Sequence, residues 1–360
     1  MVKPTSAKDN SQSVNAPTQR ELPSTAPGRA EPVGARASAP LLVREIGSMH
    51  VGGRSATLDG LPGMDVTFSP GNPPFRVNPN GAFEIEQMYV QYVRLVAPRA
   101  FQPLLLMHGG GLCGVCYETT PDGRPGWQSF FLHAGHDVHV ADAVERGRAS
   151  WARSPEFLRG APMFRTKAEA WELFRIGPEG SWRGNTGASQ PYPDSRFPVD
   201  AFDQSMKQSI PRWTTTDAAI QAAYDTLAHD HGPFAIIAHS QGGNFAFNMA
   251  LRHPGKVRAI VALEPSGFPD PVSSKLHTLA GIPHLFIWGD NTGVNETWLS
   301  MRRGLARYIA ALRASGVAVD EFDLPSMGIR GNSHMLMMDR NSDEIAARVQ
   351  RWFESRDLMG

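Results

Sequence analysis

Short runs of consecutive apolar residues alternate along the chain with segments of helical periodicity. The runs at 104–107 and 234–238 are typical of strands buried on both faces of a parallel sheet. The segment 217–227 instead repeats apolar residues at the spacing of one helix face. This alternation predicts an α/β fold, with a mostly parallel central sheet and helices on both faces. The other predicted strands are 137–141, 258–263, 284–288 and 317–324, and the other predicted helices are 127–133, 244–251, 298–312 and 342–353.

Two parts of the pattern differ from this alternation. Residues 45–53 and 83–96 alternate apolar and polar positions, which predicts two antiparallel strands near the start of the domain. Residues 150–212 show no regular period, and a loop of that length in a compact domain is usually functional. We interpret this segment as a cap over the active site; the alternative is a surface excursion whose aromatic residues only pack on the core. Its aromatic residues are Trp151, Phe157, Phe164, Trp171, Phe174, Trp182 and Tyr192.

The first forty residues have a different composition from the rest. Residues 1–40 are rich in Pro, Ser, Ala, Thr and Gly and almost lack large apolar side chains, so we predict that they are disordered. The segment also lacks the apolar stretch of a secretory signal, which favours the cytoplasm; a periplasmic or secreted location stays open for a trimmed chain. Residues 41–360 are predicted to form one domain that includes the cap at 150–212.

The charge balance narrows the partners that we expect. The chain has 35 Lys and Arg and 35 Asp and Glu, so its formal net charge is zero. This composition gives no support for a nucleic-acid or anionic-membrane partner. No apolar run approaches the roughly 18 residues of a membrane-spanning helix. The oligomeric state is left open, with a homodimer as one alternative.

A serine lies at the junction between a predicted strand and a predicted helix. The sequence Ala238-His-Ser-Gln-Gly242 places Ser240 where the chain must turn tightly, which holds the hydroxyl out above the sheet edge. Ala238 and Gly242 occupy the two small positions of the usual Gly-x-Ser-x-Gly pattern. We interpret Ser240 as a catalytic nucleophile.

A serine nucleophile needs a base and a carboxylate that orients the base. His334 follows the last predicted strand, so its loop can reach back over Ser240, and it is the predicted base. Glu264 and Asp290 each end a strand at the carboxyl edge of the sheet, where open α/β folds bind ligands. The residues alone do not decide between these two acids.

The oxyanion of such a reaction needs backbone N–H donors. One predicted donor is Gln241, directly after the nucleophile, and the other is Gly110 in the turn His108-Gly-Gly-Gly111. No metal or organic cofactor is expected. Cys113 and Cys116 have Cys-x-x-Cys spacing, but a zinc site needs more ligands, so we expect a local disulfide or two free thiols.

With these residues placed, the chain resembles the α/β-hydrolase superfamily over about residues 41–353. It is most similar to a small group of bacterial carboxylesterases whose triad acid is a glutamate after the sixth strand. This resemblance favours Glu264 over Asp290 as the acid. The group can carry two adjacent disulfide-bonded cysteines in the oxyanion turn, where this chain has Gly110 and Gly111. The matching segments are 47–53 (GSMHVGG), 118–123 (ETTPDG), 146–148 (RGR), 238–242 (AHSQG), 263–265 (LEP) and the His334 loop.

The predicted function is therefore hydrolysis of a small-molecule carboxylic ester through an acyl-enzyme on Ser240. The aromatic cap suggests a substrate with an apolar or aromatic moiety. The same chemistry serves an amidase, a lactonase or a thioesterase, and these alternatives stay open. A non-catalytic binding protein on the same scaffold is a further alternative, although no triad residue is evidently missing.

Overall fold

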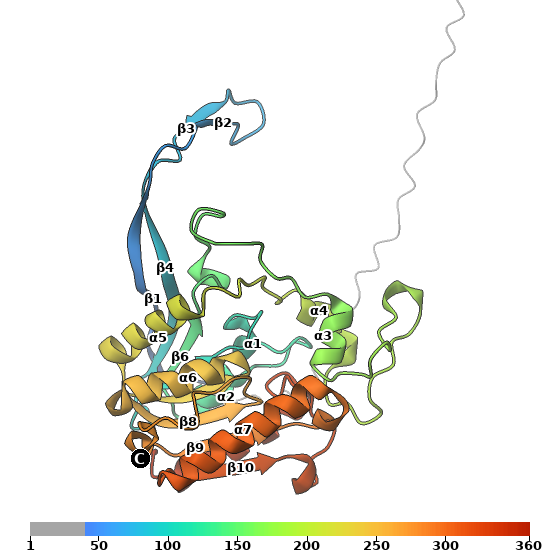
Figure 1. Ribbon diagram of the computed structural model, residues 1–360. Helices are drawn as coiled ribbons and strands as arrows, with labels where there is room; N and C mark the ends of the chain where they lie inside the picture. Colours follow the sequence, from blue (N-terminus) through green and yellow to red (C-terminus); the bar gives the residue numbers. More distant parts are fainter. Residues whose placement is uncertain (1–39) are drawn as a thin grey trace, which may run out of the picture. The chain divides into compact units, whose positions relative to one another are not determined.

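The structure is a computed structural model that describes residues 40–360. The segment predicted to be disordered, 1–40, lies outside these described residues except for Pro40. The described residues form an eight-stranded sheet with the predicted alternation of strands and helices (Figure 1). The strand order is β1 (Val43–Leu58), β4 (Gly81–Leu95), β6 (Val138–Asp142), β5 (Leu104–Met107), β7 (Phe234–His239), β8 (Val257–Leu263), β9 (His284–Trp288) and β10 (Val319–Asp323).

The sheet is parallel from β6 to β10, and β4 runs antiparallel to both of its neighbours. The strands β5, β6, β7 and β9 are buried at every position because helices cover both faces, and most of their residues are apolar. In β7, for example, Phe234 and Ile236 face one apolar core, whereas Ala235 and Ile237 face the other. Such strands lack the alternation of a half-exposed strand, as the sequence predicted.

Five helices cover the two faces of the sheet. The first face carries α5 (Asp217–His231), α6 (Gln241–Arg252) and α7 (Glu296–Ala314), whose buried residues share one apolar core. The second face carries α2 (Trp127–His133) and α8 (Ser342–Ser355), which pack on each other. In this arrangement the carboxyl ends of β5, β7, β8 and β9 meet at one edge, where the predicted site residues follow the strands.

The strands β1 and β4 form a hairpin that is longer than the alternation predicted. Only Tyr89–Val93 of β4 pairs with β6, whereas β4 pairs with β1 from Gly81 to Leu95. The hairpin therefore continues past the sheet, and its far end carries the small ribbon of β2 (Met64–Val66) and β3 (Phe75–Val77), as Figure 1 shows.

The segment 150–212 contains short helices, contrary to our expectation of no regular structure. Helix α3 (Lys167–Leu173) begins after Thr166, whose hydroxyl accepts a hydrogen bond from the Glu169 backbone N–H at 3.2 Å. This Thr-x-x-Glu spacing is a capping signal present in the sequence. A second helix, α4 (Phe202–Met206), follows near the end of the segment.

The two cysteines flank the start of the short helix α1 (Val115–Glu118), and both are buried free thiols. Burial raises the pKa of the Cys113 thiol to about 11 and raises that of Cys116 well above its ordinary value. A thiol with a raised pKa is a poor nucleophile at neutral pH. Of the two alternatives from the sequence, the structure has free thiols rather than a disulfide.

Candidate active site

Ser240 occupies a strained turn between β7 and α6. Its φ is 51° and its ψ is −120°, a conformation that residues other than glycine rarely adopt. The turn is possible because its neighbours are small: a Cβ atom on Gly242 would lie 2.7 Å from the His108 carbonyl oxygen. The hydroxyl of Ser240 is thereby held at the carboxyl edge of the sheet.

His334 lies on the loop between β10 and α8, and neighbouring aromatic rings fix its orientation. Its ring stacks on Phe174 at 5.8 Å between centroids and lies 4.3 Å from the Trp298 ring. The His334 backbone N–H donates to the Phe174 carbonyl oxygen at 2.9 Å. Burial lowers the pKa of His334, and Arg175 and Arg165 lower it further, against the raising effect of Glu264. The imidazole is therefore held in its neutral form at neutral pH.

Glu264 follows β8 with a positive φ of 48°, which turns its side chain toward His334. Its Oε2 lies 3.3 Å from His334 Nδ1. Its other oxygen, Oε1, accepts hydrogen bonds from the Gly289 backbone N–H and from Arg175 Nη2, the latter at 2.6 Å. Burial alone would raise the pKa of Glu264, but Arg175 and the hydrogen bonds outweigh it and lower the pKa to about 2. The carboxylate is therefore ionised at every working pH.

Asp290 has a different set of partners. Its Oδ1 accepts from the Asn291 backbone N–H at 2.8 Å, and its Oδ2 accepts from the Gly331 backbone N–H at 3.1 Å. These bonds join the turn after β9 to the base of the His334 loop. Of the two candidate acids, the structure brings Glu264 to the histidine and uses Asp290 to fasten the loop that carries it.

The serine and histidine lie in one cluster at the edge of the sheet. The rings of His334 and His239, the residue before Ser240, are 4.5 Å apart, and His239 Nε2 bonds to the His334 carbonyl oxygen at 2.9 Å. In the described part of the chain, the Ser240 hydroxyl pairs with the Ser266 hydroxyl at 3.2 Å rather than with His334. Hydrogen bonds of catalytic groups are often formed only when substrate is bound.

The glycine turn after β5 packs directly against the serine. A Cβ atom on Gly109 would lie 2.9 Å from the Ser240 Cβ, and one on Gly110 would lie 2.9 Å from Gln241 Oε1. Gly110 therefore lies against the side chain of Gln241, the first residue of α6, where free backbone N–H groups favour an anion. The structure thus brings the two predicted oxyanion donors, Gly110 and Gln241, together.

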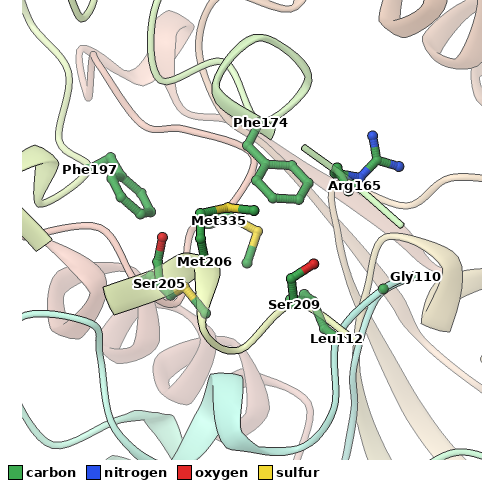
Figure 2. A pocket seen from close by; sticks show the side chains of 11 residues that line it. Gly110, Leu112, Arg165, Phe174, Phe197, Ser205, Met206, Ser209 and Met335 are labelled. Atoms are coloured by element: carbon green, nitrogen blue, oxygen red, sulfur yellow. The ribbon is translucent and has the colours of Figure 1, made fainter. Parts of the chain in front are cut away.

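A small pocket adjoins this cluster (Figure 2). Gly110 lines this pocket, and so does Phe174, whose ring stacks on His334. The lining is mostly apolar, and much of it comes from the segment 150–212, which supports the interpretation of that segment as a cap. The lining residues are Gly110, Gly111, Leu112, Arg165, Phe174, Phe197, Ser205, Met206, Ser209, Met335 and Met338.

The aromatic residues of the cap contribute less to this pocket than we expected. Of the seven aromatic residues named in the sequence analysis, Phe174 alone lines the pocket. Trp171 is buried and packs on Trp182 and Phe202, with centroid distances of 5.5 and 5.1 Å. Trp151 packs on Trp213 at 5.2 Å. Trp171 and Trp182 therefore stabilise the segment itself, and methionines supply much of the apolar pocket lining.

Sequence reasoning missed three residues of the site. Arg175 holds Glu264 from the cap, Trp298 packs on the His334 ring, and Ser266 bonds to the nucleophile. Ser266 lies two residues after Glu264, so its proximity to the edge of the sheet was visible in the sequence. Nothing local distinguishes Arg175 or Trp298 from other cap or helix residues.

Within residues 40–360, no group of three or more His, Cys, Asp or Glu side chains is placed to hold a metal ion. The same range contains no helix that is long and apolar enough to cross a membrane.

Residues 102–286 match the family described as the alpha/beta hydrolase fold. The chain belongs to this α/β-hydrolase family. The match confirms the fold class predicted from the alternation of strands and helices.

Two similar proteins extend this comparison. The solved structure of a bacterial esterase shares 31% identity, covers 88% of this chain and 98% of its own, and superposes with a TM-score of 0.74. A protein named probable secreted lipase phiG, from a fungal species (strain ATCC 74256), is 26% identical over 337 residues, which is 77% of this chain and 88% of that protein. These α/β-hydrolase relatives are thus named as enzymes that cleave esters.

Proposed function

We propose that this α/β-hydrolase is a carboxylic ester hydrolase with Ser240, His334 and Glu264 as its catalytic triad. The observation that carries the proposal is the pairing of His334 with a buried carboxylate beside a serine on a strained turn, with 3.3 Å between His334 Nδ1 and Glu264 Oε2. The names of the bacterial esterase and the fungal lipase support an ester as the substrate.

The geometry supports a two-step reaction through an acyl-enzyme. His334 takes the proton of Ser240 as the serine oxygen attacks the ester carbonyl, and the backbone N–H groups of Gln241 and Gly110 stabilise the oxyanion. His334 then gives the proton to the leaving alcohol. Water attacks the acyl-enzyme by the same route and releases the acid. Glu264 keeps the Nδ1 proton of His334 in place and stabilises the imidazolium that forms.

A panel of substrates with one acyl group tests the proposed bond specificity. We expect kcat/KM to be highest for the ester of a set that also contains the matched thioester, amide and lactone, because the relatives are named for ester cleavage. Faster turnover of another member would assign the site to a thioesterase, amidase or lactonase. If none of the four is turned over by protein that circular dichroism shows to be folded, a binding protein is favoured.

The pH dependence of kcat/KM should report the neutral form of His334. Burial lowers the pKa of this histidine from its ordinary value of 6.5, so the base stays neutral to lower pH than a free imidazole. Activity should therefore be lost as the pH falls through a midpoint below 6.5. Glu264, with a pKa of about 2, stays ionised throughout, so the acid limb should follow a single ionisation. A profile measured from about pH 5 to pH 9 checks this, and a midpoint above 6.5 would contradict it.

A further inference from the structure

Two arginines outside the triad lie near Gly110 in the glycine turn after β5. Arg165 lines the pocket beside Phe174, with its guanidinium carbon 5.9 Å from the ring centroid (Figure 2). Arg212 Nη1 donates to Gln241 Oε1 at 2.8 Å and is the nearest atom to a Cβ built on Gly110. The second arginine therefore lies against both predicted oxyanion donors.

Among the described residues, only one of these two arginines has an acidic partner. Arg165 is half-buried and forms an ion pair with Glu169, whereas Arg212 forms no ion pair with any acidic residue in the range 40–360. The Nε of Arg212 is buried and has no hydrogen-bond partner among those residues. Within residues 40–360 the guanidinium of Arg212 therefore has no acidic partner, and it can bind an anion.

The charge of Arg212 acts on Arg165, and the charge of Arg165 acts on His334. Burial lowers the pKa of Arg165, and the charge of Arg212 lowers it further against the effect of Glu169. The charge of Arg165 likewise lowers the pKa of His334. Arg165 is therefore within electrostatic range of His334, and Arg212 bonds to Gln241, the residue after Ser240. No carboxylate lines the pocket. Like charges held together in such a site are stabilised by a bound anion.

We propose that the preferred substrate is an ester that bears a carboxylate a few carbon atoms from the scissile carbonyl, and that Arg165 and Arg212 bind this carboxylate. The inference rests on the proposed ester hydrolysis. The planar guanidinium of arginine matches a carboxylate with two parallel hydrogen bonds. The apolar lining by Phe174, Met206 and Met335 suits the hydrocarbon chain between the two groups.

A series of esters of similar length that differ in the charge of their terminal group tests this proposal. The acyl-side series is monomethyl glutarate (anionic), methyl hexanoate (neutral) and the methyl ester of δ-aminovalerate (cationic). The alcohol-side pair is the acetate ester of γ-hydroxybutyrate (anionic) and pentyl acetate (neutral). We expect kcat/KM for the anionic member of one set to exceed that of its neutral match by roughly 10- to 100-fold, the usual effect of a charged hydrogen bond. The set with the larger ratio identifies the side that carries the carboxylate.

Variants of the two arginines show whether they are the cause. Arg165→Gln and Arg212→Gln should each lower the anionic-to-neutral ratio of kcat/KM by roughly 10-fold or more. The ratio cancels any general loss of folded or active enzyme. Arg258→Gln is the matched control, because Arg258 is exposed near the start of β8, at the opposite end of that strand from Glu264. This control should leave the ratio unchanged.

The possible outcomes separate this inference from the proposed function. Equal turnover of anionic and neutral esters, or a ratio that neither arginine variant changes, would overturn the carboxylate site and leave ester hydrolysis intact. No turnover of any ester by folded protein would overturn both. A preference for the cationic ester would overturn the assignment of Arg165 and Arg212 as substrate-binding residues.

Discussion

Ser240→Ala is expected to lower kcat for a test ester by roughly 10⁵- to 10⁶-fold, as for loss of a serine nucleophile in other hydrolases. The change removes only the oxygen that would form the acyl-enzyme. Alanine keeps the Cβ atom, so it tolerates the φ of 51° about as well as serine does. The loss should therefore be in kcat without a comparable change in stability. Steady-state kinetics with a chromogenic ester, and a thermal melt of each protein, measure the two effects.

Ser266→Ala provides the matched control for this experiment. Ser266 is the hydroxyl partner of Ser240 at 3.2 Å, so the variant removes a neighbouring hydroxyl and keeps the proposed nucleophile. A fluorophosphonate should label the parent protein and Ser266→Ala at residue 240, and it should fail to label Ser240→Ala. Undiminished turnover by Ser240→Ala, or labelling at Ser266 instead, would end the proposed mechanism.

The sheet was predictable because helices bury both faces of its strands. The predicted strand at 284–288 has the bounds of β9, and the predicted helix at 127–133 has those of α2. In both segments the local pattern and the three-dimensional surroundings favour the same structure. The runs at 104–107 and 234–238 agree with β5 and β7 to within one residue for the same reason.

The segment 150–212 was predicted as an insertion in the alternation of strands and helices, but its internal structure was not. Its aromatic residues pack on one another across turns, as Trp171 does with Trp182 and Phe202, so burial there follows no helical or strand period. The start of α3 at Thr166 was detectable as a capping signal, whereas the packing of the cap on His334 was not. Contacts of this kind depend on the path of the whole segment.

The candidate site, too, could be predicted only in part from the sequence. Ser240 and His334 were identifiable from their places after β7 and β10, since neighbouring parallel strands end at one edge. Glu264 and Asp290 were equivalent by that criterion because β8 and β9 are adjacent. The difference between them comes from the positive φ at Glu264 and from Arg175, which is 89 residues away in sequence. Neither feature has a local sequence signal.

The paired variants Glu264→Gln and Asp290→Asn should differ by about 1,000-fold or more in their effect on kcat. Each replaces a carboxylate by an amide of the same shape. At position 264 the amide N–H₂ would face His334 Nδ1, which must then accept a hydrogen bond and carry its proton on Nε2, toward the serine. A histidine in this tautomer cannot take the serine proton, and the corresponding change in a serine protease costs about 10⁴-fold in kcat. Asp290→Asn should cost less than about 10-fold, because it loses one hydrogen bond to the backbone N–H of Asn291 or Gly331 and none to His334.

The stability of the two variants must be measured with their activity, because Glu264 also neutralises Arg175. Both side chains are fully buried, and removal of one partner of such a pair costs about 3–5 kcal/mol in the free energy of unfolding. Activity should therefore be normalised to active-enzyme concentration by titration with a fluorophosphonate, at a temperature where each variant is folded. Glu264→Gln should then still be labelled slowly at Ser240, with kcat reduced in the fully folded protein. An inactive Asp290→Asn together with an active Glu264→Gln would assign the role of triad acid to Asp290. In that case the loop at Gly331, which now bonds to Asp290, would have to move before catalysis.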